Sequence, residues 1–121
     1  EIDAGDTYAY DNEGLKTQKA REIAAKERIY SLLPKDQKEK LIAIFDEFEE
    51  NQTAEAKFAH AMDNIQPLLR NNSNDGGDWR AHNVTASQVY HRQGKTKLGS
   101  EKLYEVTDQI LKDNIKKGNL K

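Results

Sequence analysis

The 121-residue chain contains no cysteine, only two prolines and a single methionine, Met62. Without cysteine it can hold neither a disulfide scaffold nor a thiolate-bound metal. It also lacks an apolar run near the ~20 residues that span a bilayer, and no charged-then-apolar leader opens it. These absences predict a soluble, cytoplasmic chain. Because Met62 is the sole methionine, we interpret the chain as part of a longer reading frame or as a processed product.

The charge of the chain is nearly balanced, with 19 Lys and Arg against 21 Asp and Glu. Proteins that bind nucleic-acid polymers usually carry a basic surplus or stripe, so this class of partner is disfavoured. Leu, Ile, Val and Phe together make up only 24 of the 121 residues. That share lies at the lower edge of what globular chains use, and it predicts a thin core.

Two helices are expected in the first half of the chain. Residues 16–33 repeat apolar side chains at roughly helical spacing, and Pro34 ends that helix and suits the first turn of the next. The second helix places its apolar side chains on one face, at Leu41, Ile44, Phe45 and Phe48. Residues 1–12, which hold four acidic side chains, are expected to form a short helix end followed by a loop.

A third helix is expected to begin after Thr53, which fits an N-cap. Its expected apolar stripe is Phe58, Met62, Ile65 and Leu69. Pro67 lacks an N–H, so it should bend or end this helix and leave the carbonyl of Asp63 free. Residues 71–83 follow with a loop composition.

Two more helices are expected toward the C-terminus. Thr85 and Gln88 match a capping box that opens a short helix, which Gly94 closes. The last helix is expected to run from its cap, Ser100, to Gly118, on a stripe of Leu103, Val106 and Ile110. No strand pattern occurs. The sequence therefore predicts an all-α fold of about five helices, in a single domain over residues 1–121.

Two regions carry carboxylates that could do chemistry. Residues 1–6 hold three of them beside Gly5, and such oxygen ligands suit hard divalent cations. The alternative is a solvated acidic loop. Asp63 flanks the apolar stripe of the third helix, so we expect it to face inward or sideways, where a carboxylate needs a cation or a hydrogen-bond partner. The alternative is an ordinary Asp at the helix boundary, and His60 is more often a surface residue than a second ligand.

Three segments together resemble the second half of the HD-domain phosphohydrolases: E-I-D-A-G-D from Glu1, L-L-P from Leu32, and A-E-A-K-F-A-H-A-M-D ending at Asp63. The nearest branch is that of the 5'-deoxynucleotidases. In that branch Glu and a Gly-Asp pair follow a His-Asp doublet, and Glu1, Gly5 and Asp6 match their spacing. Asp63 stands in the register of the family's fourth metal ligand. The family's first His and its His-Asp doublet lie upstream of the position of Glu1.

The resemblance implies that the chain is the C-terminal part of an HD domain, an all-α helical bundle. It also implies metal-assisted hydrolysis, in which a divalent cation (Mn, Co, Mg or Zn) polarises a phosphate and activates the water that attacks phosphorus. Asp63 would be the metal ligand at the primary site. Glu1 and Asp6 would be catalytic residues lining the phosphate site, where Asp6 would contact the substrate, or together they would hold a second cation.

By the same resemblance, the complete protein would remove the 5'-phosphate from deoxyribonucleoside monophosphates and would form a homodimer. It would bind neither a nucleic-acid polymer nor a membrane. Two alternatives stay open. One is another HD-type phosphoesterase or pyrophosphohydrolase, and the other is a non-catalytic helical interaction or dimerisation module. In either case residues 1–121 alone are expected to be inactive and to bind metal poorly. The apolar face from Leu41 to Phe48 should be partly uncovered.

Overall fold

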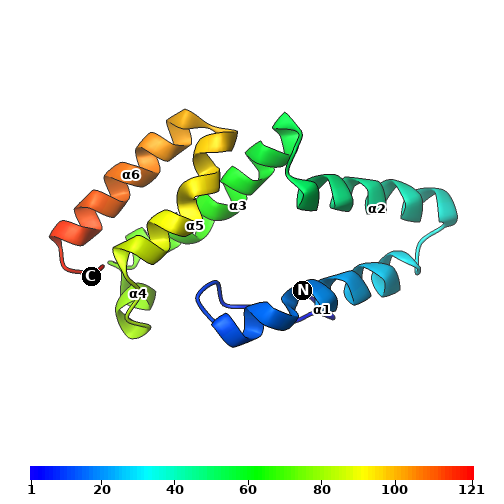
Figure 1. Cartoon of the computed structure of the whole chain (residues 1–121), viewed down its shortest axis with the longest axis horizontal. Helices are drawn as coiled ribbons and strands as arrows, with labels where there is room; N and C mark the ends of the chain where they lie inside the picture. The colour runs from blue at the N-terminus through cyan, green and yellow to red at the C-terminus, as the bar shows by residue number, and fades with distance from the viewer. The chain divides into compact units, whose positions relative to one another are not determined.

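The computed structural model describes all of residues 1–121 and contains six α-helices and no strand (Figure 1). The all-α fold class is thus confirmed, with one helix more than expected. The chain divides into two compact units, Glu1–Asp46 and Glu47–Lys121. None of the six helices combines the length and the apolar character needed to cross a membrane. The expectation of one domain over residues 1–121 stays a prediction.

The first unit contains α1 (Asn12–Tyr30) and most of α2 (Lys35–Glu50). Helix α1 begins earlier than residue 16 because the side chain of Asp11 caps it, accepting a hydrogen bond from Glu13 N at 3.1 Å. Pro34 lies just before α2 rather than in its first turn, and its carbonyl accepts a hydrogen bond from Lys38 N. An ion pair between Lys26 and Asp46, with 2.7 Å between Nζ and Oδ1, joins the two helices.

Helix α2 keeps its apolar face uncovered, as expected. It has no fully buried residue, and the side chains of Leu41 and Ile44 are 37% and 52% exposed. Phe45 packs edge-on against Tyr30 of α1, with 6.4 Å between ring centroids. The amphipathic pattern therefore predicts the helix correctly, while two of the four residues of its apolar stripe, Leu41 and Ile44, lie at the surface.

The second unit is built from α3 (Ala54–Ser73), α5 (Ala86–Gly99) and α6 (Glu101–Lys116), which pack side by side, and the short α4 (Gly77–Ala81) (Figure 1). Three predicted caps are confirmed: Thr53 for α3, Thr85 with its capping box for α5, and Ser100 for α6. The apolar core of the unit consists of Ala56, Ala61, Ile65, Leu68, Trp79, Val84, Val89, Leu111 and Leu120.

The expected stripe on α3 is wrong for three of its four residues. Phe58, Met62 and Leu69 are each nearly half exposed, and only Ile65 is buried. The buried face instead carries small residues such as Ala61, because α5 comes very close to α3 there. A Cβ built on Gly99 of α5 would stand 2.8 Å from the Cβ of Ala61. The buried face thus combines small residues, where the two helices approach, with the larger Ile65 and Leu68.

The helix ends differ from expectation at three places. Pro67, expected to bend or end α3, does not end it, and the helix continues to Ser73. The expected loop at residues 71–83 contains the end of α3 and the whole of α4, with Trp79 buried. Gly94 does not close α5, which runs on to Gly99. In the last helix, Val106 of the expected stripe is 42% exposed, while Leu111 is fully buried.

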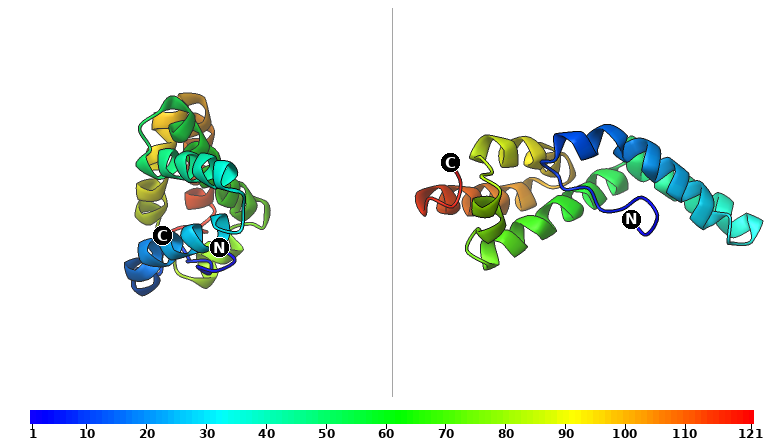
Figure 2. Two further views of the ribbon diagram at one scale, coloured as in Figure 1. Left: turned by 90° about the vertical axis from the view of Figure 1, so that its right-hand side faces the viewer. Right: turned by 90° about the horizontal axis from the view of Figure 1, so that it is seen from below.

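A polar network fastens the last residues of the chain to the end of α3. Asn114, which is fully buried, donates from Nδ2 to Asn72 Oδ1 at 2.9 Å and accepts from Asn119 Nδ2 at the same distance. Asn119 also donates to Asp75 and accepts from Arg80. In Figure 2 these last residues, drawn in red, leave α6 as a short coil. The buried amides are thus satisfied by one another.

Candidate functional site

The acidic segment at residues 1–6 forms one helical turn. Gly5 N donates to the carbonyl of Glu1 at 2.8 Å, and Gly5 ends the turn in the left-handed region with φ of +75°. Glycine suits that conformation because it carries no Cβ. Because the first α-helix begins only at Asn12, the predicted short helix end is reduced to this single turn, and a loop follows it as predicted. Both candidate carboxylates of this segment, Glu1 and Asp6, lie at the surface.

Arg28 of α1 holds the third carboxylate of the segment, that of Asp3. Its Nη2 donates to Asp3 Oδ1 at 2.6 Å and its Nε donates to Oδ2, so the ion pair is bidentate. The hydrogen bonds from Arg28 lower the pKa of Asp3 below its usual range. Asp3 is therefore engaged in fixing the turn to α1.

Arg21 lies on the same face of α1 as Arg28, two turns earlier. It holds the backbone of the same segment. Its Nη1 donates to the carbonyl of Ala4, and its Nη2 donates to Thr7 Oγ1 at 2.7 Å. The sequence interpretation did not single out either arginine. Their signal was present, because residues seven apart share a helix face and both arginines follow a carboxylate-rich loop.

Asp63 lies on α3 in the second unit and is exposed, so of its two expected orientations, inward or sideways, the inward one is wrong. The residue after it, Asn64, is the one that turns inward. Asn64 is 7% exposed, and its carbonyl accepts a hydrogen bond from Gln93 Nε2 of α5 at 2.9 Å. Asp63 therefore stands on the surface of α3 at the border of the face that packs against α5.

His60 is engaged with Phe48 and not with Asp63. Its Nε2 lies 2.8 Å from the carbonyl oxygen of Phe48, and its ring stacks on the Phe48 ring with 3.9 Å between centroids. No three His, Asp or Glu side chains of residues 1–121 are grouped so that they could hold a metal ion. The donors of this chain alone therefore do not make up a metal site. Glu1 and Asp6 belong to the first unit and Asp63 to the second.

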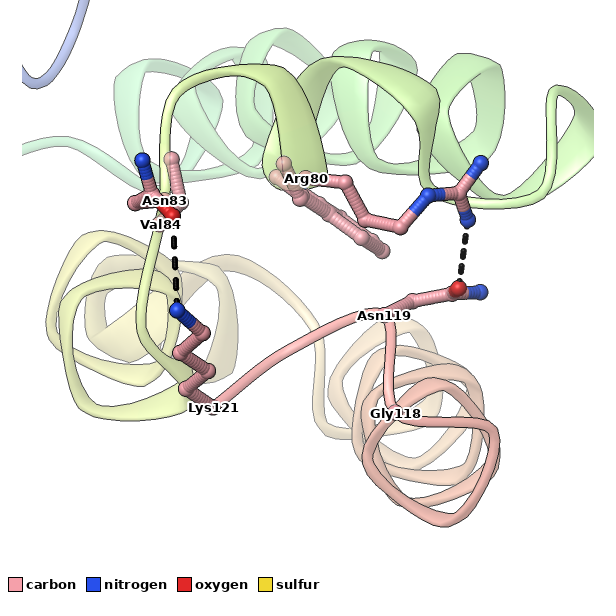
Figure 3. A pocket seen from close by; sticks show the side chains of 7 residues that line it. Arg80, Asn83, Val84, Gly118, Asn119 and Lys121 are labelled. Carbon is pink, nitrogen blue, oxygen red and sulfur yellow. Dashed lines mark hydrogen bonds between the residues drawn. The ribbon is translucent and has the colours of Figure 1, made fainter.

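A cavity of about 220 Å³ opens beside α4, between it and the last residues of the chain (Figure 3). The cations that border it are held by amides: Arg80 Nη1 donates to Asn119 Oδ1 at 2.5 Å, and Lys121 Nζ donates to Asn83 Oδ1 at 3.3 Å. None of the predicted site residues lines it. Its lining consists of Trp79, Arg80, Asn83, Val84, Gly118, Asn119 and Lys121.

Comparison with known proteins agrees with the all-helical fold. Residues 1–104 match the family model of the HD domain, so the chain belongs to the HD-domain family. No curated protein matches the chain.

The chain is also similar to a solved structure, that of a predicted metal-dependent phosphohydrolase from Magnetospirillum magnetotacticum MS-1. The two chains share 37% sequence identity, with a TM-score of 0.93 over 99% of the present chain. The chain spans 60% of the length of that protein.

Proposed function

We propose that this chain is part of a metal-dependent phosphohydrolase. The observation that carries the proposal is the joint match to the HD domain over residues 1–104 and to a structure described as a predicted metal-dependent phosphohydrolase at 37% identity. Fold likeness alone would be a weak argument for chemistry. Here the likeness comes together with carboxylates at Glu1, Asp6 and Asp63, whose spacing resembles that of the family's site.

Within this class we propose a deoxyribonucleoside 5'-monophosphate as the substrate. Support comes from the segment at residues 1–6 and from the Glu-Ala-Lys start at residues 55–57, which precedes Asp63 in the register of the 5'-deoxynucleotidase branch. A phosphomonoester would then be the group that is hydrolysed.

We assign Asp63 as one ligand of a divalent cation, and Glu1 and Asp6 as residues of the phosphate site. Carboxylate oxygens suit Mg²⁺ and Mn²⁺. The exposure of Asp63, Glu1 and Asp6 leaves these oxygens accessible to a ligand. Because residues 1–121 group no three such donors, the remaining ligands must come from elsewhere. In the family they are the His and the His-Asp doublet that precede the position of Glu1.

The proposal is tested by measuring phosphate release by the full-length protein in the presence of Mn²⁺ or Co²⁺. Substrates should include deoxyribonucleoside and ribonucleoside 5'-monophosphates, a nucleoside triphosphate and a phosphodiester. We expect turnover of the deoxyribonucleoside monophosphates. Preference for the diester or the triphosphate would favour another HD-type phosphoesterase or pyrophosphohydrolase, and no turnover of any substrate would remove the enzymatic proposal.

The role of Asp63 is tested by Asp63→Asn in the same protein. A metal ligand supplies several kcal/mol of transition-state stabilisation, so kcat should fall at least about 100-fold. Asp113→Asn is the matched control, because Asp113 is also an exposed helical aspartate of the second unit. Equal kcat in the two variants would contradict the assignment.

The non-catalytic alternative, a helical interaction or dimerisation module, is favoured by one observation: α2 buries none of its residues. The two functions differ in the coding sequence upstream of Glu1. His-Asp at the fourth and third positions before Glu1, with another His further upstream, would support the hydrolase. Other residues at those positions would support the interaction module.

A further inference from the structure

One guanidinium group organises the backbone on both sides of Asp6. Arg21 of α1 donates from Nη1 to the carbonyls of Ala4 and Gly5, the second at 3.5 Å. These are the last carbonyls of the helical turn that begins at Glu1, and such carbonyls have no partner within their own turn. Arg21 therefore acts as the C-terminal cap of the turn that carries Glu1.

The same group continues past Asp6. Nη2 of Arg21 donates to Thr7 Oγ1 at 2.7 Å and to the carbonyl of Gly14 at 3.2 Å. Its Nε donates to Thr17 Oγ1 at 3.2 Å, which fixes the side chain against its own helix. The points of attachment, residues 4, 5 and 7, bracket Asp6. The backbone of Asp6 is thus tied to α1 on either side, while its carboxylate stays at the surface.

The count of donors decides what Arg21 can do. A guanidinium has five N–H donors. The structure gives Arg21 five acceptors, three of them main-chain carbonyls and two of them threonine hydroxyls. An arginine beside carboxylates in a phosphohydrolase invites assignment as a phosphate ligand. With its donors engaged in the protein, Arg21 has none to offer a phosphate without releasing the loop.

We propose that Arg21 is a positioning residue, which fixes Glu1 by capping the turn that begins there, fixes Asp6 by holding the residues on either side of it, and does not itself bind phosphate. This inference rests on the proposed function for what Glu1 and Asp6 do. The fixing itself does not depend on it. A lysine could not substitute, because its ammonium is a point donor without the planar fork that reaches acceptors on two sides.

The first test is amide hydrogen exchange at Gly5, whose N–H donates to the carbonyl of Glu1, in the full-length protein. Arg21→Gln should accelerate exchange of this amide by about tenfold or more, because exchange follows the local opening of a segment. Lys19→Gln is the matched control, since it removes an exposed positive charge from α1 but leaves the hydrogen bonds to residues 4, 5 and 7 intact. Exchange at Gly5 that is equally fast in the two variants would overturn the proposal.

The second test separates positioning from phosphate binding by kinetics. Arg21→Gln should lower kcat by about 10- to 100-fold, as misplacement of a reacting group does, with KM changed much less. A rise in KM at constant kcat would instead identify Arg21 as a phosphate ligand and overturn the proposal. Arg21→Lys should fail to restore kcat. Circular dichroism of each variant confirms that the helices are retained.

A double-mutant cycle shows whether Arg21 acts through Asp6. In the background of Asp6→Asn, the effect of Arg21→Gln on kcat should shrink markedly, because the group being positioned is gone. Full additivity would overturn the proposal while leaving the phosphohydrolase activity of the unmodified protein in place. If the unmodified protein hydrolyses no phosphate ester, the proposed function fails, and the exchange experiment alone decides whether Arg21 fixes the turn.

Discussion

The backbone carbonyl of Lys57 in α3 and the α-carbon of Gly99 in α5 lie so close that a Cβ on Gly99 would stand 2.2 Å from the carbonyl oxygen. This contact explains why the last residue of α5 is a glycine. Main-chain atoms of two packed helices cannot yield as the tip of a flexible side chain can, so any larger residue would separate α3 from α5.

Gly99→Ala should therefore destabilise the chain by about 1–3 kcal/mol, as overpacking of a tight contact does. Gly94→Ala is the matched control on the same helix, because a Cβ there meets nothing within 4 Å. An exposed helical glycine replaced by alanine should stabilise by about 0.5–1 kcal/mol. Urea unfolding of both variants measures the two free energies, and effects of the same sign would contradict the close approach of α3 and α5.

Two buried threonines should respond differently to loss of their hydroxyl groups. Thr96 donates to Gln93 Oε1 at 2.8 Å, whereas Thr107 Oγ1 is buried without a hydrogen-bond partner. Thr96→Val should cost about 1–2 kcal/mol, because it leaves the buried oxygen of Gln93 without this donor, while Thr107→Val should be neutral or stabilising. Thermal unfolding of the two variants checks this, and a larger loss at residue 107 would show that its hydroxyl has a partner.

The stability of the second unit should decline in alkali through Tyr90. Burial, helped by the hydrogen bond that its hydroxyl donates to Asp108 at 2.9 Å, raises the pKa of Tyr90 to about 12. This folded-state pKa lies above the ordinary value of 10, so the neutral phenol stabilises the folded chain. Its contribution to the free energy of unfolding is complete below pH 10 and is lost as the pH rises toward 12.

The free energy of unfolding is measured as a function of pH for the unmodified chain and for Tyr90→Phe. Ionisation of the phenol is followed by phenolate absorbance. The Phe variant should show a shallower decline between pH 10 and 12, the interval set by the shift of the Tyr90 pKa. Parallel curves would mean that the phenol titrates in the folded protein as it does in the unfolded one.

Residues 1–121 alone should bind divalent metal weakly. They group no three His, Asp or Glu side chains, and a single carboxylate such as Asp63 cannot close a metal site. Calorimetric titration with Mn²⁺ or Co²⁺ should give no tight stoichiometric binding, and Asp63→Asn should change the weak heats little. A sharp one-to-one isotherm would require a metal site that these 121 residues complete by themselves.

The sequence predicts the local features of this fold better than its packing. Caps such as Thr53 and Ser100 are correct because a cap is decided within one turn, by a side chain and a main-chain N–H a few residues apart. Gly94 and Gly99 cannot be distinguished in this way. Only the approach of α3 makes a glycine necessary at residue 99, whereas an exposed glycine such as Gly94 costs a helix about 1 kcal/mol, which packing readily offsets.

The same distinction applies to the buried face of α3. Periodicity selects Phe58, Met62 and Leu69, since they are large and apolar, yet the close packing of α5 selects the face that carries Ala61. For the candidate site, the turn at residues 1–6 was predictable from Gly5. The surface position of Asp63 was not, because it follows from which face of α3 is buried. The assignment of Glu1, Asp6 and Asp63 to phosphate chemistry stays a prediction.

Because the last residues of the chain lie beside α4, the fluorescence of Trp79 in α4 can report on their position. Trp79 is the only tryptophan in the chain, is 3% exposed, and borders the same cavity as Asn119 and Lys121. Its emission therefore reports on one place, the closure of residues 118–121 over α4. A red shift with unchanged helix content would signal release of this segment while the rest of the second unit stays folded.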